Sequence, residues 1–132
     1  MTLTELEAEA EALWRELPPG GVVWLSGDLG AGKTAFVQAL ARAARAEPAR
    51  SPTYALVHEY RSPAGPLLHV DCYRLRTPDE AADLDFDTLV RRARLLAVEW
   101  PERAGAWAPP PDAYLAFAHT DRPDRRTVQR LA

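Results

Sequence analysis

The chain has 132 residues, of which 47% are hydrophobic and 27% are charged, and its formal net charge is -3. These values are typical of a globular protein, and the length predicts one domain over residues 1–132. A protein that grips nucleic acid by itself is expected to be basic, whereas the isoelectric point here is about 5.6. Any contact with nucleic acid is therefore expected to be indirect.

The sequence gives no indication of a membrane span, because no stretch approaches the ~20 consecutive apolar residues that a spanning helix needs. The acidic residues Glu5, Glu7, Glu9 and Glu11 at the N-terminus are the opposite of a secretory signal, so we expect a cytoplasmic protein. The only cysteine, Cys72, has no partner for an internal disulfide and is expected to be a buried, inert thiol.

The first predicted element is a helix over residues 4–17, in which Leu6, Ala10 and Leu13 recur at helical spacing. Thr4 and Glu7 are placed to form a capping box at its start. A proline-glycine turn over residues 18–21 ends this helix, and the apolar run over residues 22–25 predicts a strand. A second helix is predicted after residue 34 and is expected to end near residues 45–47.

The rest of the chain alternates between strand and helix signals. Strands over residues 54–60 and 67–71 are predicted to form a hairpin, one helix or two short ones to follow over residues 79–94, and a buried parallel strand over residues 95–99. A closing pair of strands is predicted over residues 114–119 and 127–131. This order predicts an α/β fold with a mostly parallel central sheet flanked by helices.

A glycine-rich motif lies between the first predicted strand and the second helix: Gly27-Asp28-Leu29-Gly30-Ala31-Gly32-Lys33-Thr34. It fits the pattern G-x-x-x-x-G-K-[ST] in the context of strand, turn and helix start that phosphate binding requires. We therefore predict that residues 28–34 bind the phosphates of a nucleotide. Lys33, the only lysine of the chain, is expected to reach the β and γ phosphates, and the Thr34 hydroxyl to bind Mg²⁺.

Two carboxylates end predicted strands of the sheet. Asp71 closes one strand and Glu99 closes another, and the C-terminal ends of parallel strands border the ligand crevice in such folds. We predict that both complete the Mg²⁺ shell and that Glu99 also orients the attacking water. His69 shares a strand face with Asp71 and is interpreted as an orienting or core histidine rather than a catalyst.

Residues elsewhere in the chain are candidates for contact with the nucleotide. Thr53 of Ser51-Pro52-Thr53 follows the second helix, where many phosphate-loop proteins place a segment that contacts Mg²⁺ and the γ-phosphate. Trp100 and Tyr73 are aromatic residues that flank the proposed site. ATP is favoured over GTP, because guanine-specific proteins of this kind commonly use Asn-Lys-x-Asp and this chain has no asparagine and no second lysine.

Four motifs occur in order along the chain: the glycine-rich motif over residues 27–34, Ser51-Pro52-Thr53-Tyr54, His69-Val70-Asp71-Cys72-Tyr73-Arg74-Leu75 and Glu99-Trp100-Pro101-Glu102. This set closely resembles the TsaE (YjeE) family, bacterial ATPases required for making N6-threonylcarbamoyladenosine (t6A) at adenosine 37 of tRNA. The resemblance implies ATP and Mg²⁺ as ligands and the TsaD and TsaB proteins as partners. It also implies site roles for Thr53, Asp71, Glu99 and Trp100.

The resemblance implies a Mg²⁺-dependent ATPase that is slow alone and stimulated by its partners. Two alternatives remain open at this point: a small-molecule kinase, and a nucleotide-dependent assembly or regulatory module with little turnover. The chain departs from the family pattern at Leu84-Asp85, where Leu-Gly is usual, so the local turn is expected to differ. A basic residue of the last strands is expected to be Arg125 or Arg126.

Overall fold

The computed structural model describes residues 2–27, 32–48, 57–119 and 126–131. Six strands form one sheet in the order β2-β3-β4-β1-β5-β6. The strands are β1 (Gly21–Gly27), β2 (Val57–Tyr60), β3 (Leu67–Asp71), β4 (Leu95–Glu99), β5 (Ala113–His119) and β6 (Arg126–Arg130). β3, β4, β1 and β5 are parallel neighbours, whereas β2 and β6 run antiparallel at the two edges. The predicted mostly parallel sheet is confirmed; residues 54–56 of the predicted second strand lie outside the described residues.

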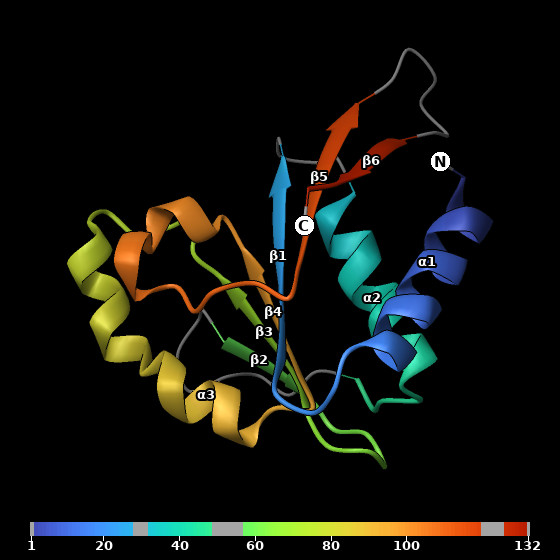
Figure 1. The fold of residues 1–132 in the computed structure, drawn as a ribbon, viewed down its shortest axis with the longest axis horizontal. Coiled ribbons are helices and arrows are strands. Elements are labelled where there is room, and N and C mark those ends of the chain that lie inside the picture. Colours follow the sequence, from blue (N-terminus) through green and yellow to red (C-terminus); the bar gives the residue numbers. More distant parts are fainter. Residues whose placement is uncertain (1, 28–31, 49–56, 120–125, 132) are drawn as a thin grey trace.

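Helices cover both faces of this sheet (Figure 1). The α-helices are α1 (Leu3–Glu16), α2 (Lys33–Ala43) and α3 (Phe86–Arg92), and the short 3-10 helices are η1 (Pro78–Leu84), η2 (Pro101–Arg103) and η3 (Gly105–Trp107). α1 and α2 pack on one face, and α3 with the short helices on the other. None of the described helices combines the length and apolar character that crossing a bilayer requires.

Alternation along the strands divides the core into two layers. Val23 and Leu25 of β1 face α1 and α2, whereas Val22 faces the α3 side. β3 and β4 are so buried that both of their faces carry apolar residues, as expected of strands covered on both sides. β1 lies near the centre of the sheet, where it is paired on both sides by β4 and β5.

Two predicted helix ends are wrong. The capping box of α1 is formed by Thr2 and Glu5, not by Thr4 and Glu7, because Thr2 has the extended backbone of an N-cap while Thr4 already lies in the helix. α2 ends at Ala43, earlier than residues 45–47. Arg45 has a φ of 55°, a left-handed conformation that stops an α-helix.

The predicted helical segment over residues 79–94 forms two short helices, η1 and α3, separated by Asp85. Asp85 has a φ of 50°, in the left-handed region that glycine adopts at the lowest cost. Its side chain accepts hydrogen bonds from the backbone N–H and the hydroxyl of Thr88, at 3.4 and 2.7 Å. The turn at this position has the left-handed conformation that suits glycine, but the residue is an aspartate whose side chain caps α3.

Candidate functional site

The C-terminal ends of the parallel strands β1, β3 and β4 lie side by side at the same end of the sheet. Asp71 pairs with Glu99 across the β3–β4 ladder, and Leu25 of β1 pairs with Glu99 on the other side. Adjacent strands are about 4.8 Å apart, so the two carboxylates belong to one site. The register confirms that Asp71 and Glu99 end neighbouring strands; their predicted role at the metal stays a prediction.

Glycines shape the two ends of the phosphate-binding motif. A Cβ on Gly27 would collide with the carbonyl oxygen of Phe117 on β5, and Gly27 has a φ of 137°. Gly32 has a φ of 112° and is the N-cap of α2, whose first turn holds no acidic residue. Thr34 is exposed in that first turn. The helix start is thus suited to an anion, because its N–H groups and dipole are positive there. Asp28, Leu29, Gly30 and Ala31 lie outside the described residues.

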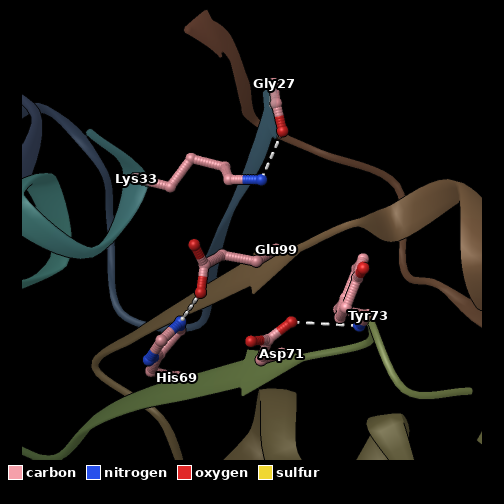
Figure 2. Close-up of polar contacts among 6 residues, drawn as sticks. All are labelled: Gly27, Lys33, His69, Asp71, Tyr73 and Glu99. Atoms are coloured by element: carbon pink, nitrogen blue, oxygen red, sulfur yellow. Dashed lines mark hydrogen bonds and ion pairs between the residues drawn. The ribbon is translucent and has the colours of Figure 1, made fainter. Parts of the chain in front are cut away.

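Lys33 is held at the centre of the site and is only 4% exposed. Its ammonium donates a hydrogen bond to the carbonyl of Gly27, the last residue of β1 (Figure 2). The same Nζ atom lies 4.0 Å from the centroid of the Trp100 ring. A cation over an indole face is attracted by the ring quadrupole, and burial strengthens this attraction. In this structure the lysine therefore has protein contacts that a phosphate chain would have to replace.

Glu99 is 4% exposed and is hydrogen-bonded to His69, whose Nε2 lies 2.6 Å from Oε2 of the carboxylate (Figure 2). His58 of β2 stacks on His69 with ring centroids 5.7 Å apart. His69 is thus fixed on both sides, which agrees with its interpretation as an orienting residue. Burial lowers the pKa of His58, and the neighbouring His69 lowers it further, while Asp71 and Glu99 act in the opposite direction.

Asp71 is more accessible than Glu99 and lies beside it (Figure 2). Its Oδ1 accepts a hydrogen bond of 3.0 Å from the backbone N–H of Tyr73, which fixes the carboxylate at the strand end. The next residue, Cys72, is fully buried, and burial raises the pKa of its thiol to about 12. The expectation of a buried thiol is confirmed.

An aromatic and basic cluster follows the two acids. The rings of Tyr73 and Trp100 have centroids 5.2 Å apart, and the Arg103 guanidinium carbon is 5.2 Å from the Tyr73 ring. Trp100 has a φ of 55°, an unusual conformation for a bulky residue of the kind found at functional sites. The sequence indicated both rings but not Arg103. Pro101 could have pointed to Arg103, because a proline that starts a tight turn brings residue 103 back toward residue 100.

The donor set fits Mg²⁺ bound together with a nucleotide. Within the described ranges, no three His, Cys, Asp or Glu side chains gather closely enough to hold a metal ion. Mg²⁺ usually binds through one or two carboxylates plus phosphates and waters, so Thr34, Asp71 and Glu99 are sufficient protein ligands in kind. Thr53 and Arg125 lie outside the described residues, and Arg126 begins β6.

The fold and this arrangement define a nucleotide-binding phosphate-loop protein. The family model described as "Threonylcarbamoyl adenosine biosynthesis protein TsaE" matches residues 1–128. The chain belongs to the TsaE family, and the predicted resemblance is confirmed.

Several curated relatives carry the name tRNA threonylcarbamoyladenosine biosynthesis protein TsaE. The Aquifex aeolicus protein is 42% identical over 97 residues, covering 71% of this chain and 68% of the relative. The Nostoc protein is 41% identical over 96 residues, covering 69% and 59%. Among solved structures, a crystal structure of Bacillus subtilis YdiB superposes with a TM-score of 0.77 at 25% identity, covering 98% of this chain and 80% of that one. The match to the Nostoc relative thus spans about six tenths of its length.

Proposed function

We propose that this chain acts as one domain that binds ATP with Mg²⁺ and hydrolyses the ATP during the synthesis of t6A in tRNA. The observation that carries this proposal is that Lys33, at the start of α2, lies in one site with the paired strand-end acids Asp71 and Glu99 (Figure 2). Phosphoryl transfer needs positioning and charge stabilisation of this kind. The names of the relatives support the pathway.

Each residue of the site has a role in the proposed hydrolysis. The amides of residues 28–34 and the Lys33 ammonium bind the phosphates, and Thr34, Asp71 and Glu99 hold the metal directly or through water. When bound there, Mg²⁺ would supply positive charge that neutralises the phosphate oxygens. Glu99 orients a water whose oxygen bonds to the γ-phosphorus while the bond to the bridging oxygen breaks, leaving that electron pair on ADP. The water's proton passes to the released phosphate. Thr53 contributes to positioning the γ-phosphate, and Trp100 lines the nucleotide site.

Slow turnover by the isolated chain is supported by the contacts of two of these residues. Lys33 donates to the Gly27 carbonyl and lies on Trp100, and Glu99 is bound to His69. Both side chains must exchange or share these contacts to act on a nucleotide, which adds to the barrier. We infer that the TsaD and TsaB proteins favour the active arrangement, and that contact with tRNA is through them because the chain is acidic.

The test is phosphate release from ATP by the purified chain, with and without Mg²⁺. TsaB, TsaD and tRNA are then added one at a time. The expected result is slow Mg²⁺-dependent release that rises when both proteins are present. Turnover that does not change on adding TsaB and TsaD contradicts the partner assignment, and absence of ATP binding contradicts the function itself.

A binding module with little turnover is the second candidate, and the engagement of Lys33 and Glu99 by protein groups favours it. Glu99→Gln separates the two. The amide keeps the size of the side chain but loses the charge that orients water. If ATP binding alone drives the pathway, t6A formation in the reconstituted system is retained by Glu99→Gln; if hydrolysis is required, phosphate release and t6A formation fall together.

A further inference from the structure

A second cation lies at the same ring as the lysine of the phosphate-binding motif. Cζ of Arg103 is 5.7 Å from the centroid of Trp100, and Nζ of Lys33 is 4.0 Å from that centroid. Because both distances end at one point, the two cations are at most 9.7 Å apart, the sum of 4.0 and 5.7 Å. A flexible arginine side chain spans a large part of such a distance.

The backbone directs Arg103 back to this ring. Pro101 starts the 3-10 helix η2, and the N–H of Arg103 donates a hydrogen bond of 3.0 Å to the carbonyl of Trp100. The side chain is exposed and lies over Tyr73, which is itself 37% exposed. Arg103 is therefore at the open rim of the site, while Lys33 lies on its buried side.

The charge of Arg103 is not neutralised by a protein acid in the described part of the chain. Its neighbour Glu102 instead lies 3.5 Å from the hydroxyl of Ser26. An exposed cation on an aromatic ring is held only weakly, because water competes for the cation. A bidentate guanidinium–phosphate contact is stronger, so a phosphate within reach would draw Arg103 from Tyr73.

We propose that Arg103 is a phosphate-binding residue that leaves the Tyr73 ring and contacts the γ-phosphate of ATP. This inference rests on the proposed function. The γ-phosphate is the end of the nucleotide next to the metal and the attacking water, and Trp100 directly follows Glu99, the residue assigned to both. The guanidinium contributes charge and hydrogen bonds only, and no bond to it forms or breaks. It is an arginine of this chain acting where many phosphate-loop enzymes use one from a partner.

The test compares Arg103→Gln and Arg103→Lys with the unaltered chain. Dissociation constants are measured for ADP and for a non-hydrolysable ATP analogue in the presence of Mg²⁺, together with single-turnover hydrolysis of ATP. Arg103→Gln is expected to weaken binding of the analogue by roughly 10- to 100-fold and to leave ADP binding nearly unchanged, since only the analogue has a γ-phosphate. Arg103→Lys is expected to retain part of the effect, and Arg76→Gln, at an exposed arginine beyond β3, to have none.

Two results overturn this assignment. One is that Arg103→Gln binds the analogue with unchanged affinity. The other is that Arg103→Gln loses the same affinity for ADP as for the analogue, which means that Arg103 does not contact the γ-phosphate. Thermal unfolding of each variant checks the fold, and Arg103→Lys provides the comparison if the glutamine variant is unstable. If the unaltered chain binds ATP but does not hydrolyse it, the proposed ATPase function fails. The ratio of the affinities for the analogue and for ADP still tests the role of Arg103 in that case.

Discussion

Nε2 of His69 lies 2.6 Å from the carboxylate of Glu99, and both side chains are less than 10% exposed. The acid reaches diagonally across the β3–β4 ladder, since Glu99 pairs with Asp71, two residues after His69. A buried carboxylate needs hydrogen bonds to hold its position. His69 is therefore a positioning residue for Glu99.

Replacing this histidine with leucine is expected to impair both stability and turnover. His69→Leu leaves a buried carboxylate without its partner, which costs about 3 kcal/mol of unfolding free energy, and the loss of orientation lowers kcat more than it raises KM. Urea unfolding and steady-state phosphate release measure the two effects. His69→Gln places an amide near the position of Nε2, so it should restore much of kcat. Equal kcat in the leucine variant and the unaltered chain contradicts the positioning role.

Lys33→Ala is expected to abolish ATP hydrolysis while the fold persists. The ammonium is expected to bind the phosphates through its positive charge. Its contacts within the protein are with the Gly27 carbonyl and the Trp100 ring. Lys33→Met is the matched control, because its unbranched side chain fills the same space without the charge. Both variants should lack phosphate release and show cooperative thermal unfolding. Full turnover in either one refutes the role given to Lys33.

Asp85 is expected to stabilise α3 in a pH-dependent way. Hydrogen bonds from Thr88 lower the pKa of the Asp85 carboxyl below its ordinary value of 3.8. Because the pKa is lower in the folded state, this contribution is present at neutral pH and is lost as the pH falls through and below that value. Asp85→Ala should lower the melting temperature at pH 7, since it loses the cap and keeps the left-handed strain. Asp85→Gly should have a smaller effect because glycine relieves the strain. A larger loss for glycine than for alanine contradicts this account.

Cys72 is expected to resist alkylation in the folded protein. Burial raises the pKa of its thiol to about 12 from an ordinary value of 9.0, so the reactive thiolate is scarce at pH 8. Iodoacetamide labelling followed by mass spectrometry should be slow in buffer and fast in urea. The raised pKa also means that this group contributes stability below pH 9, which is lost as the pH rises toward 12. Rapid labelling of the folded chain contradicts the prediction.

The pattern of apolar residues was sufficient for the fold class, because burial on both sides of β3 and β4 leaves near-continuous apolar runs. The strand-end positions of Asp71 and Glu99 followed from the same runs. Helix ends were predicted less well. Capping by Thr2 rather than Thr4, and the stop after Ala43, depend on backbone angles that several neighbouring residues fit almost equally.

The order of the motifs along the chain by itself determined the family and the kinds of group at the site, since local spacing fixes which residues follow a strand or begin a helix. Only the tertiary structure decided which of them touch. Glu99 meets His69, and the Trp100 ring contacts both Lys33 and Tyr73, because of strand order and register. Those contacts join residues far apart in the chain, and their geometry is set by how the sheet and helices pack rather than by spacing in the sequence.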